Sequence, residues 1–284
     1  MRESDIIKLL VLTLIIVCTI IVWLLTRPTP LPISTTGNSV FICNSNFDGS
    51  SYKKVLKIPR TIIQSWKTRE SVPTRIFKQF EKYAPEYRYQ FFDDSESILF
   101  IQTNFFHLLP VYSSLKNGAH KADLFRYCYL YLYGGIWIDI KTILIKPLKH
   151  VLPDEYGIYT VKSIMDMNGG STCYQGIIAV PPRTNFMQDM ITSFVLASET
   201  VDKTGYLTFC RQMYYYFEKN YDQVIIGKNY GNSMLTLHLL EEYDKTNCPT
   251  KKDRFDFCTY VRDENGQDLF KIRDSDFPWQ LTAN

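Results

Sequence analysis

Two adjoining segments carry the strongest structural signal in this chain: Lys121-Ala122-Asp123-Leu124-Phe125-Arg126-Tyr127 and Tyr133-Gly134-Gly135-Ile136-Trp137-Ile138-Asp139-Ile140-Lys141. The first belongs to a predicted helix over residues 119–133, which the glycine pair ends. The second contains a predicted buried strand over residues 136–140. A strand's period of two puts Trp137, Asp139 and Lys141 on one face. Charges that end an apolar strand cost desolvation unless they are paired. This strand end is therefore either a salt bridge, a solvated end or a binding site.

Outward from these segments, short β-rich runs alternate with segments of helix length. We predict further strands over 60–66, 87–92, 157–161 and 176–180, and further helices over 72–83, 185–197, 204–219 and 232–242. Strands that alternate with helices indicate an α/β fold with a mostly parallel sheet flanked by helices. Sheets of this kind bind ligands at the carboxyl ends of their strands. Asp139 and Lys141 lie at such an end.

Composition excludes several classes of protein. The 284 residues contain 32 Lys+Arg and 29 Asp+Glu, a net charge of +3, so affinity for nucleic acid through phosphate neutralisation is not expected. With 45% hydrophobic residues the chain can bury a core. Six cysteines follow residue 26. Cys248 and Cys258 would close a short loop, but the sequence leaves disulfide connectivity open.

The first residues predict a membrane anchor. Residues 9–26 are uncharged and rich in Leu, Ile and Val, and as a helix they would reach ~27 Å, close to the thickness of a bilayer core. We therefore expect a short tail over 1–8, a transmembrane helix over 9–26, a stem over 27–54 and one domain over 55–284. Arg2 and Lys8 precede the apolar run, which favours a cytoplasmic N-terminus and a lumenal or extracellular domain.

Asp123 and Arg126 stand at positions i and i+3 of the predicted helix and so share one face. Taken alone they would be a surface ion pair. The two residues are, however, followed along the chain by the glycine pair and the strand that ends at Asp139, and this order favours a binding site. The two opening segments resemble the "R/K-A-D-x-x-R-Y … Y-G-G-x-Y-x-D-x-D" signature of the DXD-containing sugar transferases, glycosyltransferase family 32.

Further segments are similar to the same family. The run Ile58-Pro59-Arg60-Thr61-Ile62-Ile63-Gln64-Ser65-Trp66-Lys67 resembles its opening "I-P-K-x-I-H-Q-x-W". Residues 174–179 resemble its "N-G-x-x-A" strand, and Thr204-Gly205-Tyr206 stands where "T-G-P" is usual. The resemblance covers about residues 58–208. It implies a GT-A-like (Rossmann-like) fold and a retaining enzyme that uses a nucleotide-sugar donor, usually with Mn²⁺.

The resemblance also implies roles for individual residues. Trp66 would stack on the nucleotide base, and Asp123 and Arg126 would hydrogen-bond the hydroxyl groups of the donor sugar. Gly135 would belong to the donor site as part of the glycine pair. Asp139 would be the first Asp of the DXD motif and would contact ribose and metal. Gln175 would lie near the anomeric face of the sugar.

Lys141 is the main departure from the family pattern, since it stands where the second Asp of the motif would bind the metal. Three interpretations follow. Lys141 takes the place of the metal, or Asp139 still holds Mn²⁺ with other carboxylates such as Asp274 and Asp276, or catalysis has been lost. Two smaller departures are Ile63 in place of His and Tyr206 in place of Pro.

The sequence thus predicts a type II membrane glycosyltransferase of the Golgi or another secretory compartment. It would transfer a hexose, most plausibly mannose, from a GDP- or UDP-hexose to a glycan or glycolipid. The rival interpretation is a catalytically inactive protein of the same fold that binds a nucleotide sugar or a glycan.

Overall fold

The computed structural model describes residues 56–198, 200, 207–232, 235–245 and 259–272. They belong to one compact unit, Lys53–Asn284. The predicted anchor at 9–26 and stem at 27–54 lie outside the described residues, as do Cys248, Asp274 and Asp276. Within the described ranges, none of the helices has both the length and the apolar character needed to cross a bilayer.

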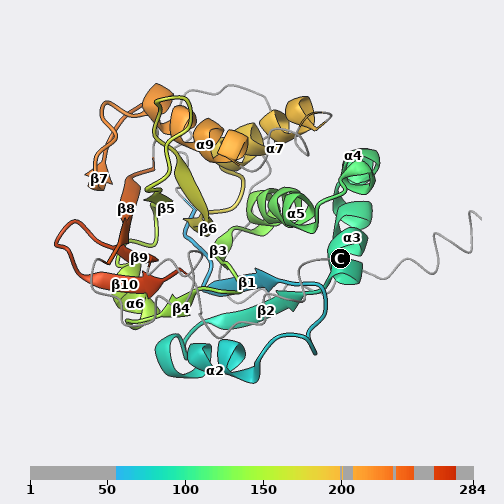
Figure 1. Ribbon diagram of the computed structural model, residues 1–284, viewed down its shortest axis with the longest axis horizontal. Helices are drawn as coiled ribbons and strands as arrows, with labels where there is room; N and C mark the ends of the chain where they lie inside the picture. Colours follow the sequence, from blue (N-terminus) through green and yellow to red (C-terminus); the bar gives the residue numbers. More distant parts are fainter. Residues whose placement is uncertain (1–55, 199, 201–206, 233–234, 246–258, 273–284) are drawn as a thin grey trace, which may run out of the picture. The chain divides into compact units, whose positions relative to one another are not determined.

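A ten-stranded sheet forms the centre of the described domain (Figure 1). Its strands are β1 (Thr61–Ser65), β2 (Arg88–Phe92), β3 (Gly135–Ile138), β4 (Ile143–Leu144), β5 (Ile158–Lys162), β6 (Cys173–Val180), β7 (Gly227–Asn229), β8 (Leu237–Asp244), β9 (Thr259–Arg262) and β10 (Asp268–Lys271). Neighbouring strands follow the order β2-β1-β3-β6-β5-β8-β9-β10-β4, and β7 pairs with β8.

Helices cover the sheet. They are α2 (Thr74–Tyr83), α3 (Asp94–Asn104), α4 (Leu109–Ser114), α5 (Gly118–Tyr133), α6 (Leu148–Val151), α7 (Asn185–Ala197) and α9 (Leu207–Asn220), with a 3₁₀ turn η1 at Phe106–Leu108. In Figure 1, α5, α7 and α9 lie on one side of β3 and β6, while α2 lies beneath β1 and β2. The main core joins α5, α7 and α9 to the sheet through side chains such as Phe125, Trp137 and Phe217. A second core on the opposite face includes Phe80 and Ile138.

The α/β class is confirmed, but the prediction of a mostly parallel sheet is wrong. Only the β1–β2, β1–β3 and β5–β8 pairs are parallel among the described strands. β6 runs antiparallel to both β3 and β5, and β8, β9, β10 and β4 continue antiparallel. Strand direction depends on partners far away in the chain, so local periodicity gave no information about it.

Two element assignments also need correction. The predicted helix over 232–242 is wrong, because residues 237–244 form β8 between β5 and β9. Its Leu and Glu residues favour a helix locally, and sheet pairing on both sides overrides that preference. The predicted strand at 136–140 ends at Ile138. A turn follows, in which the Thr142 N–H donates to the Asp139 carbonyl at 2.9 Å. Asp139 and Lys141 therefore project from a turn rather than from one face of a strand.

The passage from α5 to β3 depends on its two glycines. Helix α5 starts at the Asn117 cap, whose side chain accepts from the Ala119 N–H, and ends at Gly134 with φ +65°. Gly135 has φ +115°. A Cβ atom on Gly135 would lie 2.8 Å from Ile63 Cδ1 and 2.9 Å from the Thr61 carbonyl oxygen. Gly135 thus lets β3 approach β1 closely.

We expect Gly135→Ala to destabilise the domain by roughly 2–4 kcal/mol, because backbone strain and steric overlap add. Gly118→Ala is the matched control: an added Cβ there meets no atom within 4 Å. That variant is expected to change stability by no more than about 1 kcal/mol. Denaturant unfolding of the purified full-length chain measures both. Equal effects of the two substitutions would contradict this account of the glycine.

Candidate active site at the carboxyl edge of the sheet

One edge of the sheet gathers the chemically important residues. The parallel strands β1 and β3 both end there, which brings Trp66 and Asp139 to the same side. Because β6 is antiparallel to β3, with Ile177 opposite Ile138, it is the start of β6 that lies at this edge. Residues that are far apart in the sequence therefore converge on one place.

The backbone of Asp139 is held on both sides. Its N–H donates to the Gly176 carbonyl at 2.7 Å, and its carbonyl accepts from the Thr142 N–H at 2.9 Å. The same carbonyl accepts from Gln64 Nε2 at 3.2 Å, and the Tyr89 hydroxyl in turn donates to Gln64 Oε1 at 2.9 Å. Gln64 is fully buried. These bonds fix the direction in which the Asp139 carboxylate leaves the chain.

A second buried glutamine holds the rest of the turn. Gln79 on α2 donates through Nε2 to the Thr142 carbonyl at 3.1 Å, and its Oε1 accepts from the Leu144 N–H at 2.9 Å. Ile140 fills an apolar cluster with Val72 and Ile76 beneath the turn. The segment from Asp139 to Leu144 is thus anchored to β1, β6 and α2. Lys141, half-buried, stands at its apex.

Lys141 and Trp66 lie together. The Lys141 ammonium sits 5.1 Å from the centroid of the Trp66 ring, a distance typical of a cation–π contact. Trp66 is half-buried and packs against the same apolar cluster as Ile140. Trp66, the ring predicted to stack on the base, is therefore in direct contact with Lys141, which replaces the second Asp of the motif.

Asp123 and Arg126 form a buried ion pair on α5. Arg126 Nη2 lies 3.1 Å from Asp123 Oδ1, and both side chains are less than a tenth exposed. Arg126 also donates through Nη1 to the Gln175 carbonyl at 2.6 Å, and its guanidinium lies 4.7 Å from the Trp137 ring. Its Nε is buried without a hydrogen-bond partner among the described residues. The interpretation as a surface ion pair is wrong, because the pair sits inside the protein behind the sheet edge.

Burial controls the protonation of this pair. Desolvation raises the pKa of Asp123 to about 6, although Arg126 and His120 pull it down, and the nearby charge of Asp139 adds to the rise. The electrostatic coupling of Asp123 with Asp139 connects the buried pair to the turn. Burial therefore moves the ionisation of Asp123 toward neutral pH.

The side chain of Gln175 points away from the edge, into the helical layer. The buried Tyr127 hydroxyl donates to Gln175 Oε1, and Gln175 Nε2 lies 3.4 Å from Cys210 Sγ on α9. Burial raises the pKa of Tyr127 well above its usual value, so the hydroxyl stays a donor. The Gln175 carbonyl oxygen in turn supports Arg126.

A bulge in β6 explains that orientation. The pairing of β5 with β6 shifts register between Tyr159 and Val161. Gln175 and Ile177, two residues apart, consequently face opposite sides: Ile177 lies in the second core, whereas Gln175 reaches Tyr127 on α5. Bulges re-aim side chains and are frequent beside active sites. Gly135, also predicted for the donor site, lies at the opposite end of β3 from Asp139 and packs against β1.

The residues described at this edge do not fit a divalent cation. Among the described parts of the chain, no three or more His, Cys, Asp or Glu side chains are grouped as metal ligands. Asp123 is committed to Arg126, and the residue two positions after Asp139 is a lysine. Metal ions prefer clustered oxygen donors. Asp274 and Asp276, named above as additional ligands, lie outside the described residues.

Gln64, Gln79 and the β6 bulge were missed from the sequence as parts of this site. Gln64 belongs to the 58–67 segment that resembles the family, so the segment was noticed but its glutamine received no role. Gln79 is one polar residue in an otherwise ordinary amphipathic helix, and the bulge depends on strand pairing. Nothing in the local sequence signals either of them.

Many α/β proteins bind their ligands at the carboxyl ends of their parallel strands. This chain has an acidic residue, a basic residue and an aromatic ring at that edge, so it fits this class of ligand-binding α/β proteins. Comparison with known proteins narrows the class. Residues 72–158 match the sequence profile of a family described as the glycosyltransferase sugar-binding region containing a DXD motif. The matched segment holds Asp123, Arg126, Asp139 and Lys141.

Curated relatives agree with this match. The chain is 27% identical over 206 residues to an initiation-specific alpha-1,6-mannosyltransferase of Candida albicans, covering 65% of this chain and 51% of that protein. It is 36% identical over 86 residues to inositol phosphoceramide mannosyltransferase 3 of Schizosaccharomyces pombe, covering 29% and 24%. An uncharacterized glycosyltransferase of Acanthamoeba polyphaga mimivirus is 27% identical over 205 residues, covering 68% and 77%.

The chain spans about half the length of the Candida relative and about a quarter of the Schizosaccharomyces one. The resemblance found in the sequence is confirmed: residues 72–158 match the sugar-binding region of the DXD-type glycosyltransferases, and the relatives found are named as glycosyltransferases or mannosyltransferases. In place of the motif's second Asp it has Lys141.

Removing the Gln64 amide should loosen the turn. In Gln64→Leu we expect the Asp139 and Thr142 amides to exchange with deuterium about tenfold faster, since a buried hydrogen bond of roughly 1–1.5 kcal/mol is lost. Gln90→Leu is the matched control: Gln90 on β2 accepts from the Tyr129 hydroxyl and does not contact the turn. Unchanged exchange in the Gln64 variant, or equal acceleration in both variants, would show that Gln64 does not anchor the turn.

Asp123 should make stability depend on pH. Its folded-state pKa, about 6, lies above the unfolded value of 3.8, so the folded protein holds this proton more tightly. The resulting stabilisation is complete below pH ~4 and is lost as pH rises through about 6, amounting to at most roughly 3 kcal/mol. Unfolding free energies of wild type and Asp123→Asn, compared from pH 4 to 7, isolate this contribution. If the free energy of unfolding of the wild type rose relative to that of Asp123→Asn as the pH increased, the predicted direction would be wrong.

Proposed function

We propose that this protein is a membrane-anchored, retaining glycosyltransferase with a GT-A-like fold that transfers a hexose, mannose in the first instance, from a nucleotide sugar. The observation that carries the proposal is the meeting of Trp66, Lys141 and Asp139 at one sheet edge, coupled to the buried Asp123–Arg126 pair. The relatives named as mannosyltransferases support the choice of sugar.

The donor would lie along this edge. Its base would stack on Trp66, because an aromatic face suits a flat heterocycle. The hydroxyl groups of its sugar would lie toward Asp123 and Arg126, as acceptor and donor respectively. Arg126 Nε, buried without a partner in the described protein, favours an oxygen ligand there, since an unsatisfied buried donor costs about 1–3 kcal/mol. Asp139 would contact the ribose.

Lys141 would supply the charge stabilisation. Sugar transfer breaks the bond between the anomeric carbon and the diphosphate oxygen, and negative charge develops on that oxygen. A preorganised positive group at this point stabilises the transition state. The turn held by Gln64 and Gln79 fixes the backbone that carries Lys141. We therefore place the ammonium where a divalent ion would otherwise stand.

The acceptor would be a glycan or glycolipid, in keeping with the names of the mannosyltransferase relatives. Residues 9–26 would anchor the protein in a Golgi or other secretory-pathway membrane as a type II protein, with the domain in the lumen. The apolar length of that segment supports this topology. Protease protection of the full-length protein in microsomes, together with glycosylation of an Asn-x-Ser/Thr site added at its C-terminus because the sequence has none, would test it.

Replacing Lys141 should separate the possible roles of this residue. We expect full-length wild type to hydrolyse or transfer one donor among GDP-mannose, UDP-glucose, UDP-galactose and UDP-N-acetylglucosamine, and to keep this turnover in EDTA. Lys141→Met should lower kcat about 100-fold. Lys141→Asp should make turnover depend on added Mn²⁺. Lys78→Met, an exposed lysine on α2, is the matched control and should leave turnover unchanged.

Each contrary result has a definite meaning. Loss of wild-type turnover in EDTA would assign the charge to a metal held by Asp139 and further carboxylates such as Asp274 and Asp276. Thermal stabilisation by a nucleotide sugar without turnover under any condition would favour the inactive binding protein. If no donor is bound or turned over, the proposed function is wrong.

A further inference from the structure

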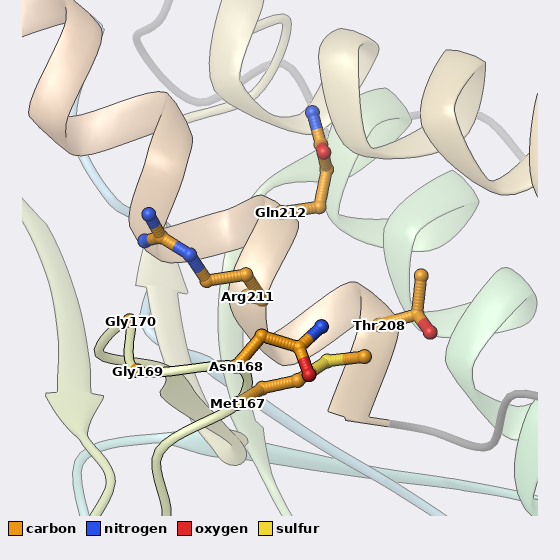
Figure 2. A pocket seen from close by; sticks show the side chains of 7 residues that line it. All are labelled: Met167, Asn168, Gly169, Gly170, Thr208, Arg211 and Gln212. Atoms are coloured by element: carbon orange, nitrogen blue, oxygen red, sulfur yellow. The ribbon is translucent and has the colours of Figure 1, made fainter.

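A hollow of about 400 Å³ lies between the β5–β6 hairpin and helix α9 (Figure 2), and neither Asp139 nor Trp66 lines it. Met167 and Asn168 line it from the hairpin together with two glycines, and Thr208, Arg211 and Gln212 line it from α9. Its volume falls in the range of small-molecule sites. None of these residues has a role in the donor site proposed above.

The hairpin wall of the hollow has a defined geometry. Met167 and Gly170 exchange two backbone hydrogen bonds of 2.9 and 3.0 Å around Asn168 and Gly169. Both central residues have positive φ, 53° and 75°. This is the two-residue turn with left-handed central residues that suits the twist of a hairpin. It holds the Asn168 amide at the tip of a short, paired ribbon.

Arg211 fixes the other wall. Its Nη1 donates to the Ser171 carbonyl at 3.2 Å and lies 2.9 Å from Glu218 Oε2. Gly170 makes this contact possible: a Cβ there would lie 2.6 Å from Arg211 Nε. The guanidinium is thus tied to the hairpin and to its own helix. The hairpin and helix α9 are therefore held together on both sides of the hollow.

The chemistry of the lining favours a neutral, hydroxyl-rich ligand. Glu218 balances the charge of Arg211, so the hollow carries no surplus positive charge for a phosphate. The amides of Asn168 and Gln212 each offer donors and an acceptor, which match hydroxyl groups. Met167 adds an apolar, polarisable surface for the C–H face of a sugar ring.

The hollow lies toward the same edge of the sheet as the donor site. The hairpin joins the end of β5 to the start of β6, and the Gly176 carbonyl accepts from the Asp139 N–H. Gly170 precedes Gly176 by six positions, so this side of the hollow lies about 20 Å or less from the residue that binds the Asp139 N–H. A ligand there could belong to the same acceptor molecule without reaching the reacting atoms.

We propose that this hollow binds a neutral saccharide unit of the acceptor, remote from the hydroxyl group that receives the hexose. The inference rests on the proposed function for its place in the reaction, but binding itself does not require transfer. It implies that the preferred acceptor is an oligosaccharide of several units rather than a single sugar or an anionic headgroup.

Calorimetry on the full-length protein, without donor, tests the site directly. The probes are a neutral α-1,6-linked mannotetraose, methyl α-mannoside and myo-inositol 1-phosphate. We expect the tetraose to bind at least tenfold more tightly than the monosaccharide. Asn168→Gly, which keeps the turn because glycine tolerates positive φ, and Gln212→Met should each weaken tetraose binding by roughly five- to tenfold. Gln188→Met, an exposed glutamine on α7, is the matched control and should not.

The outcomes separate this inference from the proposed function. Tetraose affinity that equals that of the monosaccharide, or that is unchanged in the Asn168 and Gln212 variants, would overturn it. Tighter binding of inositol phosphate that Arg211→Met abolishes would also overturn it, in favour of an anionic headgroup. Failure of the wild type to bind any nucleotide sugar would instead refute the transferase assignment and leave the saccharide measurement standing.

Discussion

The backbone of Asp139 is the fixed point from which the sheet edge is built. Three hydrogen bonds hold its two peptide groups, from β6, from the turn and from Gln64 on β1. Gln79 then fixes the far side of the turn. Lys141 is a long, flexible side chain, so its ammonium can be directed only if the backbone beneath it cannot move. The two buried glutamines therefore place a charge that neither of them touches.

The Asp123–Arg126 pair adds a second constraint, of a different kind. Burying two charges costs several kcal/mol per ion, so a pair like this contributes little net stability. It is bound into a layer of polar contacts that links α5 to β6 and α9 through Gln175, Tyr127 and Cys210. Such networks favour one arrangement of the helices over its alternatives. Apolar residues could have filled this space without the cost of desolvating two charges. The presence of the pair is therefore consistent with a role in ligand recognition.

Sequence reasoning found the local parts of the fold and of the site. The α5 helix and the β3 strand follow from periodicity and from the glycine pair. The position of Asp139 and Lys141 follows from the end of the strand, and Trp66 was added to the site only through the family resemblance. What it missed depends on long-range pairing. The direction of β6, the strand state of β8 and the bulge that turns Gln175 inward are all decided by neighbouring strands. The predicted alternation of side chains fails beyond Ile138 because β3 ends there and a turn begins at Asp139.

The antiparallel pairing of β4 with β10 has a consequence for how the protein is made. Strand β4 follows directly on the turn that carries Lys141, and its partner β10 is the last strand in the described part of the chain. During synthesis, the N-terminal elements emerge and begin to fold first. The outer flank of the Lys141 turn therefore stays open until the residues of β10 have been synthesised, more than 120 positions after β4. The nascent chain would therefore complete this edge of the sheet only after β10 has left the ribosome and paired with β4.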